Sequence, residues 1–211
     1  MKPLRQHQGV AVPLLRINID TDAIIPSREM KRVSKKGLGQ GLFAGWRYRY
    51  EGDEKVGPEP EFALNQPAYA GASILLAGAN FGCGSSREHA VWALAEYGFR
   101  VLVAPSFGSI FRNNCIRNGL LPVTLPAEQV ETLADSLQPD PQQRRIKVDL
   151  EARVIETADG RTLEFSIDEA ARKTLLDGLD AIEVTLRHDD AIQAFKAADR
   201  QRRAWASLWP E

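Results

Sequence analysis

The chain has 211 residues, a formal net charge of −1 and 44% hydrophobic residues, which are the proportions of an ordinary globular protein. This balance argues against nucleic-acid binding as the main role, and no apolar run approaches the roughly 20 residues that a membrane helix requires. The N-terminus has no hydrophobic signal-peptide core, so we expect a cytoplasmic protein of one domain, with or without an appendage.

The first predicted elements are a strand and a capped turn. Residues 10–14 (VAVPL) favour a strand, in which Pro13 indicates a sheet edge or a bulge. Residues 18–26 (NIDTDAIIP) place Asp and Thr at the start of an apolar segment, which is typical of a turn and a helix N-cap. Residues 27–46 are polar, cationic and rich in glycine, and predict a mobile loop. Residues 48–69 favour an irregular connection, with a short helical turn at 62–65.

The central stretch, residues 74–95, predicts a buried strand, a glycine turn and a helix. The apolar run ILLA at 74–77 is typical of a buried strand, and glycines follow at 78, 82 and 84. Ser85 or Ser86 is a natural N-cap for the helix, and Glu88 lies three residues after Ser85, as a capping box requires. The last part of the stretch, AVWALA at 90–95, has the composition of a helix.

The start of this predicted helix favours anions. The first N–H groups of a helix lack intrahelical partners and carry partial positive charge, and Arg87 adds a planar cation suited to carboxylate or phosphate. A Walker loop would need Lys and then Ser or Thr after its last glycine, and a dinucleotide fingerprint would need a third glycine where Arg87 stands. Neither pattern is present, although a phosphate- or nucleotide-binding module remains an alternative.

The second half of the chain predicts further strands and helices. Residues 100–104 favour a strand that would form a β-α-β unit with the first. A helix over 107–117 follows, with Ser106 as its cap and Gly119 at its end. The remaining predictions are strands at 120–123, 146–150, 154–157 and 162–165, with helices at 127–137, 168–176 and 188–209. The pattern leaves residues 180–187 open between strand and helix.

The cysteines and histidines do not suggest a metal site. Cys83 and Cys115 are the only cysteines, too few for an iron–sulfur cluster held by this chain alone. We expect Cys115 to be a small core residue and Cys83 to be a spacer or a wall of the site. His7, His89 and His188 are far apart in the sequence, and for His89 we expect a structural or supporting role.

Residues 80–90 (NFGCGSSREHA) resemble the signature of the aconitase-type swivelling domain, and more closely that of the small subunits of 3-isopropylmalate dehydratase. Residues 20–26, 106–114 and 118–122 resemble the same family, and the resemblance covers roughly residues 9 to 197. It implies an α/β fold, the swivelling β/β/α domain, with a partly open barrel-like sheet flanked by helices. The implied organisation is a single domain over 1–211, with a substrate-specificity loop and irregular connection at 27–70 and a C-terminal helical appendage at 180–211.

The resemblance also implies a function. Enzymes of this family are heteromeric hydro-lyases of leucine biosynthesis, which isomerise 2-isopropylmalate to 3-isopropylmalate by dehydration and rehydration. We therefore expect a large-subunit partner whose cysteines hold a 4Fe–4S cluster, no cofactor or metal in this chain, and no activity from this chain alone. The expected ligand is a small dicarboxylate, and no nucleic-acid or membrane partner is expected.

The resemblance carries roles to individual residues. Ser85 matches the catalytic base, while the positions that bind substrate or line the site are Ser86, Arg87, Thr21 and Asp22. The specificity loop includes Glu29, Met30, Lys31 and Arg32, where the family typically has an aromatic residue and leucine at the first two positions. Because of this departure, a sister hydro-lyase acting on citraconate and 2-methylmalate, or on homoaconitate, remains an alternative. A non-catalytic accessory subunit is a third interpretation.

Overall fold

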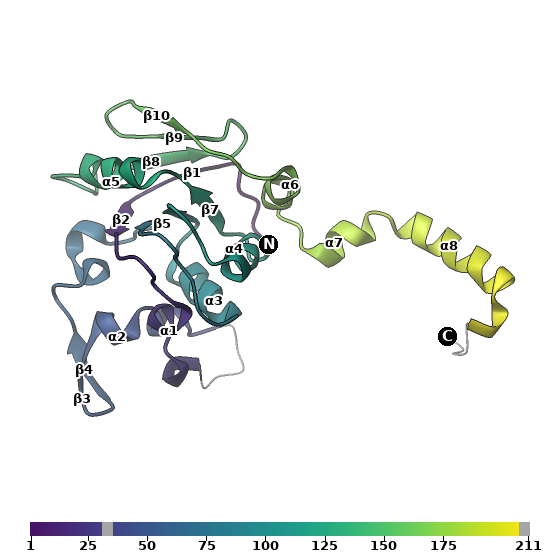
Figure 1. Cartoon of the computed structure of the whole chain (residues 1–211), viewed down its shortest axis with the longest axis horizontal. Helices are drawn as coiled ribbons and strands as arrows, with labels where there is room; N and C mark the ends of the chain where they lie inside the picture. The colour runs from purple at the N-terminus through teal and green to yellow at the C-terminus, as the bar shows by residue number, and fades with distance from the viewer. Residues whose placement is uncertain (31–35, 207–211) are drawn as a thin grey trace. The chain divides into compact units, whose positions relative to one another are not determined.

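The computed structural model describes residues 1–30 and 36–206 (Figure 1). The chain divides into two compact units, Met1–Gly178 and Leu179–Glu211. Within the described ranges, no helix has both the length and the apolar character needed to cross a membrane.

A four-stranded parallel sheet forms the centre of the first unit. Its strands follow the order β2 (Ala11–Leu14), β5 (Ile74–Ala77), β6 (Val101–Ala104) and β7 (Leu121–Thr124). All three neighbouring pairs are parallel. Because β2 lies at the edge, Pro13 removes no hydrogen bond that a central strand would need, and the edge position expected from this proline is confirmed.

The parallel strands are buried on both faces, which explains their continuous apolar sequences. In β5, Leu75 and Ala77 belong to one hydrophobic core, and Ile74 and Leu76 belong to the other. The same alternation holds along β6. The sheet therefore separates two cores, one on each face.

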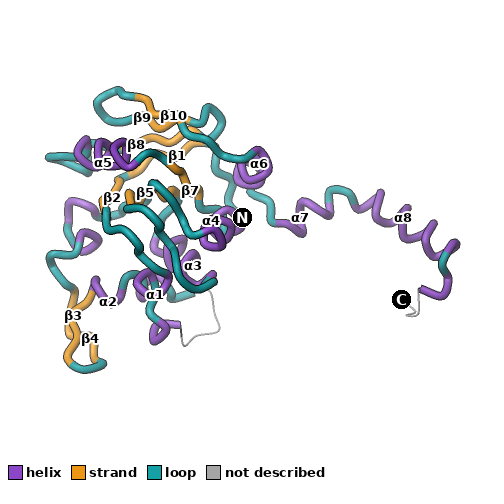
Figure 2. Tube along the Cα trace, in the orientation of Figure 1, coloured by secondary structure: helices purple, strands orange, loops and turns teal. Residues whose placement is uncertain are grey.

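Helices cover one face, and a second sheet with helices covers the other, so the layers follow the β/β/α pattern (Figure 2). The first core is closed by α1 (Thr21–Ile24), α3 (Glu88–Tyr97) and α4 (Ser109–Arg117). The second is closed by α5 (Ala127–Ser136), α6 (Glu169–Asp177) and an antiparallel sheet. The order of that sheet is β1 (Gln6–Gly9), β8 (Ile146–Asp149), β9 (Val154–Glu156) and β10 (Thr162–Glu164).

The described residues between α1 and β5 form several short elements where the composition predicts an irregular loop. These elements are the 3₁₀ turns η1 (Ser27–Met30), η2 (Gly39–Gly41), η3 (Ala63–Asn65) and η4 (Pro67–Tyr69), the helix α2 (Ala44–Arg47) and the hairpin β3 (Tyr48–Glu51) with β4 (Glu54–Pro58). The sequence predicts a mobile loop here and does not predict that Leu38, Leu42 and Phe43 are buried in the first core. The glycines of this segment allow close packing, since a Cβ on Gly39 would lie 3.0 Å from the backbone nitrogen of Tyr97.

The second unit consists of α7 (Ala181–Leu186), α8 (Asp189–Arg202) and the 3₁₀ turn η5 (Ala204–Ala206). The open question over residues 180–187 is resolved as a helix, because Asp180 and Glu183 form a reciprocal capping box at its start. The predicted final helix ends earlier than expected, at Arg202, and its predicted end at Trp209 lies outside the described residues.

Candidate active site

Three loops meet at the carboxyl edge of the parallel sheet. They follow β2, β5 and β6, which are neighbours in the sheet, so the loops leave it side by side. Two isolated bridges continue the parallel pairing past the strand ends, between Asp20 and Cys83 and between Phe81 and Phe107. This edge is where ligands bind in open parallel sheets, and it brings together the segments at 20–26, 80–90 and 106–114.

The glycine turn after β5 is held tightly against its neighbours. Gly82 has φ of +71° and donates its N–H to the carbonyl of Ile19 at 2.7 Å. A Cβ on Gly82 would lie 2.2 Å from the ring of Phe111, so no side chain fits there. Gly84 has φ of +90°, which also favours glycine. These contacts therefore fix the backbone of the turn and hold Ser85 at the edge of the sheet.

Thr21 and Ser85 come together across two of these loops. Asp20 caps α1 by accepting the N–H of Ala23 at 2.7 Å, as the sequence predicts, and Thr21 is the first residue of that helix. The Thr21 hydroxyl lies 3.1 Å from both the carbonyl oxygen and the hydroxyl of Ser85. Thr21 is only 1% exposed, whereas Ser85 and Ser86 are exposed. Ser85 and Ser86 are thus open to solvent, while Thr21, which contacts Ser85, is buried.

Arg87 forms an ion pair with Asp22 beside these hydroxyls. The Arg87 side chain is 26% exposed and that of Asp22 is 55% exposed. The backbone N–H of Arg87 donates to the carbonyl of Ser85 at 2.8 Å, which places the guanidinium group and the serine in one tight turn. The structure therefore brings Thr21, Asp22, Ser85 and Arg87 into one cluster, with exposed Ser86 between the last two in sequence.

The predicted helix caps in this region are wrong. Helix α3 begins at Glu88 with Arg87 at the N-cap position and no side-chain cap, so neither Ser85 nor Ser86 caps it. The Glu88 carboxylate accepts from Asn118 at 2.8 Å rather than closing a capping box. The Arg87 N–H donates to the Ser85 carbonyl in a turn, so the helix begins only at Glu88. The hydroxyls of Ser85 and Ser86 therefore lie on the loop.

Ser106 does not cap α4 either. Its hydroxyl accepts the backbone N–H of Asn80 at 2.8 Å, and the helix begins later, at Ser109, with Gly108 at the N-cap position. Ser106 therefore joins two neighbouring loops at the carboxyl edge. The predicted end of α4 at Gly119 is confirmed, with φ of +77° just after the final helical residue.

The histidines lie in three different environments. The His89 ring packs against Trp92 with the ring centroids 4.8 Å apart, which agrees with a structural role. His7 lies on β1, 2.8 Å from the Ser73 hydroxyl, and burial lowers its pKa. His188 is at the N-cap position of α8. Among the described residues, no group of three or more His, Cys, Asp or Glu side chains is arranged to hold a metal ion.

The two cysteines differ in accessibility. Cys115 on α4 is fully buried in the first core, as expected, and burial raises the pKa of its thiol well above the ordinary value. Cys83 is half-buried in the glycine turn, where its carbonyl accepts the N–H of Thr21 at 3.0 Å. Its backbone therefore helps to hold the two loops together.

The predicted specificity residues are described only in part. The Glu29 carboxylate accepts a hydrogen bond from Lys55 of the β3–β4 hairpin at 2.9 Å, and Met30 packs against the first core. Lys31 and Arg32 lie outside the described residues. The contact between Glu29 and Lys55 was not predicted, because residues 26 positions apart give no local signal of their pairing.

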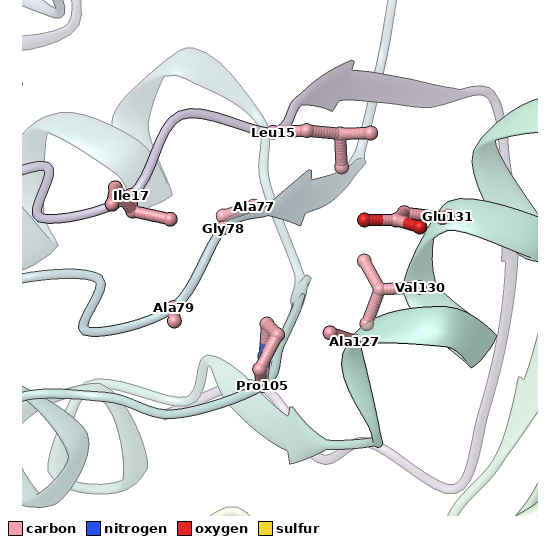
Figure 3. Close-up of a pocket in the computed structure, with 9 residues that line it drawn as sticks. All are labelled: Leu15, Ile17, Ala77, Gly78, Ala79, Pro105, Ala127, Val130 and Glu131. Atoms are coloured by element: carbon pink, nitrogen blue, oxygen red, sulfur yellow. The ribbon is translucent and has the colours of Figure 1, made fainter.

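A cavity of about 90 Å³ opens at the same edge of the sheet, towards α5 (Figure 3). Its lining is mostly apolar and consists of Leu15, Ile17, Ala77, Gly78, Ala79, Pro105, Ala127, Val130 and Glu131. Among these residues Glu131 is the only ionisable one, and its charge would repel an anion. The cavity is therefore unsuited to a dicarboxylate, in contrast to the cluster around Arg87.

Comparisons with known proteins show which proteins this chain resembles. A family model of the aconitase C-terminal domain matches residues 1–128. The chain is 59% identical over 205 residues to a 3-isopropylmalate dehydratase small subunit of Cupriavidus necator, covering 97% of this chain and 98% of that one. It is 46% identical to the protein of the same name from Bacillus subtilis, with the same coverage. It also resembles the crystal structure of 3-isopropylmalate dehydratase (leuD) from Methanocaldococcus jannaschii, with a TM-score of 0.64, 24% identity and coverage of 90% and 99%, a likeness that concerns the fold.

Proposed function

Because the chain belongs to the family of 3-isopropylmalate dehydratase small subunits, with the aconitase C-terminal-domain fold, we propose that its carboxyl edge is one half of a shared active site. The family reaction is a step of leucine biosynthesis, in which 2-isopropylmalate loses water and regains it to give 3-isopropylmalate. A small subunit implies a large one. The other half of the site would be supplied by that large subunit.

The proposed role of Ser85 is that of the base. In the dehydration step a proton leaves one carbon of the substrate, and the hydroxyl leaves the neighbouring carbon. We assign the Ser85 oxygen, in its ionised form, as the acceptor of that proton, which it returns to the other carbon during rehydration. A serine hydroxyl is far too weakly acidic to ionise unaided, so nearby cations and N–H groups are needed, and Arg87 is the nearby cation.

Ser86 and Arg87 are proposed to hold a substrate carboxylate. The planar guanidinium group can bind both carboxylate oxygens, and it now lies against the carboxylate of Asp22. Asp22 therefore binds one N–H group of the Arg87 guanidinium, and a substrate carboxylate would compete with Asp22 for that group. Fixing the dianion this way aligns its reacting carbon with Ser85.

The large subunit is proposed to bring the cofactor. A Lewis acid for the leaving hydroxyl is the chemistry that a 4Fe–4S cluster of the large subunit would supply when bound. The thiols described here do not suit such a cluster, because Cys115 is fully buried and Cys83 is the only other one in the chain. The cytoplasmic location expected from the sequence belongs to the same proposal.

The single observation that supports this proposal is the exposure of Ser85 and Ser86 beside a half-buried Arg87. An active site that removes a carbon-bound proton needs to exclude water, and these groups are open on the surface of this chain. A partner that covers the edge would enclose them. The geometry thus fits a site that is completed by association.

The test is Ser85→Ala in the assembled enzyme, prepared without oxygen and assayed on 2-isopropylmalate. Turnover should fall by at least about 100-fold with little change in KM, because the base is lost while the carboxylate contacts remain. Ser166→Ala, an exposed serine between β10 and α6, is the matched control and should leave turnover unchanged. Near-normal turnover of Ser85→Ala would overturn the assignment.

Residues 27–70 are proposed to set the choice among malate homologues. Within this range Glu29 is tied to the hairpin through Lys55, at the place where the family typically has an aromatic side chain. A panel of 2-isopropylmalate, 2-methylmalate and homoaconitate, assayed on the same enzyme, measures this choice. If kcat/KM is higher on 2-methylmalate or homoaconitate than on 2-isopropylmalate, that compound becomes the proposed substrate.

A further inference from the structure

We propose that Thr21 positions the hydroxyl of Ser85 and supports its ionised form, rather than binding substrate. This inference rests on the proposed function, in which Ser85 is the base. Thr21 is 1% exposed, so a substrate on the open side of the turn cannot reach its hydroxyl. The same hydroxyl lies 3.1 Å from two different oxygens of Ser85. Thr21 therefore acts on the site through Ser85.

Counting protons assigns a direction to each of these hydrogen bonds. The carbonyl oxygen of Ser85 can only accept, so the contact with it uses the single hydroxyl proton of Thr21. The contact between the two hydroxyls then requires Ser85 to donate to Thr21. This arrangement turns the Ser85 proton towards the buried side and leaves a lone pair of its oxygen facing the open side. An acceptor for a substrate proton needs that orientation.

The arrangement also allows support for the ionised state. When Ser85 ionises, its proton leaves to the solvent that reaches this exposed residue, and the Thr21 hydroxyl can then rotate and donate to the charged oxygen. The Ser85 carbonyl is not left without a partner, because it also accepts the N–H of Arg87 at 2.8 Å. Rotation therefore exchanges a bond to a neutral oxygen for a stronger one to a charged oxygen.

The position of Thr21 is well determined by its surroundings. Its backbone N–H donates to the carbonyl of Cys83 at 3.0 Å, and Asp20 fixes the start of the helix that carries it. A β-branched side chain has few rotamers in a helix, so the hydroxyl oxygen of Thr21 keeps its position while its proton remains free to turn. Thr21 thus provides a hydrogen-bond donor that the turn cannot supply from within itself.

The experiment compares Thr21→Val, which keeps the shape but loses the hydroxyl, with Thr21→Ser, which keeps the hydroxyl, in the assembled enzyme. For Thr21→Val, kcat should fall about 10- to 100-fold, KM should change less than about threefold, and the acidic limb of the kcat–pH profile should move to higher pH. Thr21→Ser should retain most of the turnover and the original profile. If the valine variant does not assemble, Thr21→Cys, with a weaker donor, should show the same direction of change.

The matched control is Thr157→Val, which removes a buried threonine hydroxyl from the turn between β9 and β10. It should lower stability and leave kcat and the pH profile unchanged. The inference is overturned if Thr21→Val keeps wild-type kcat, if only KM rises, or if Thr21→Ser loses as much turnover as Thr21→Val. Failure of the base assignment itself is distinguishable, because then Ser85→Ala would also retain turnover.

Discussion

Gly82 is the residue at which the glycine turn and the first hydrophobic core meet. Its φ of +71° lies in the left-handed region, and the Phe111 ring fills the space in which a side chain would stand. The same ring packs edge-on against Phe81, with the centroids 5.4 Å apart. The path of the chain towards Ser85 is therefore fixed by packing as well as by backbone hydrogen bonds.

Replacing this glycine should destabilise the fold. We expect Gly82→Ala to lower the free energy of unfolding by about 3 kcal/mol, since it adds left-handed strain and overpacks the ring of Phe111. Gly52→Ala is the matched control, because Gly52 has φ of +60° but nothing within 4 Å of an added Cβ, and it should cost only about 1 kcal/mol. Denaturant unfolding of both variants measures the difference. Equal losses would show that packing against Phe111 contributes nothing.

The site residues are predictable from local sequence, but their contacts are not. Ser85 and Arg87 stand out because a glycine turn precedes a helical pattern. Thr21 lies 64 positions away from Ser85, and their contact depends on β2 and β5 being neighbours in the sheet. The predicted serine caps are wrong for a related reason, since residues on other loops bind the hydroxyls of Ser85 and Ser106.

Among the elements, strands buried on both faces are the easiest to predict. Their apolar runs reflect burial that does not depend on the identity of the partner, and β5, β6 and β7 lie within one residue of their predicted bounds. The strand β1 and the β3–β4 hairpin were missed, because β1 and β4 are polar and the alternation of tyrosine with charged residues in β3 spans only four residues. Such strands form through pairing with a partner strand, which the local sequence does not reveal.

Helix α3 connects the signature turn to the backbone at Gly37 and Gly39. The Glu96 carboxylate, in its last turn, accepts the N–H of Gly37 at 2.6 Å and that of Gly39 at 2.8 Å. The hydrogen bond from Gly37 is the largest cause that lowers the pKa of Glu96 below its ordinary value. The exposed Glu96 carboxylate thus links Gly37 and Gly39, which belong to the predicted specificity region, to the helix that begins at the site.

This contact should make a pH-dependent contribution to stability. Because the pKa of Glu96 is lower in the folded protein, its contribution is present above the unfolded-state pKa and is lost as the pH falls through the folded-state pKa. Glu96→Gln should therefore be less stable than wild type at neutral pH, by less than about 1 kcal/mol because solvent screens the exposed group. Unfolding at several pH values should show the gap closing in acid. Glu131→Gln, at an exposed position on α5, is the matched control for the loss of one carboxylate.

On the scale of the whole molecule, the fold gathers its chemistry on one edge and leaves that edge open. The parallel sheet and its two cores hold the loops, while Ser85 and Ser86 remain exposed. The proposed partner would cover this edge. Cys83 lies at this edge, whereas Cys115 lies in the first core. The reactivity of one thiol therefore measures whether the edge is covered, and the reactivity of the other measures whether the core is folded.

Thiol labelling at neutral pH should therefore separate docking from unfolding. Cys83 should react readily in the isolated chain and become protected at least about 10-fold when the large subunit binds, because the partner is proposed to cover its turn. Cys115 should react slowly in both states, since it is fully buried and its raised pKa keeps the thiol protonated. Its labelling should become fast only in denaturant, at the same concentration at which the helical signal is lost. Unchanged reactivity of Cys83 in an active complex would place the partner on a different face of the chain.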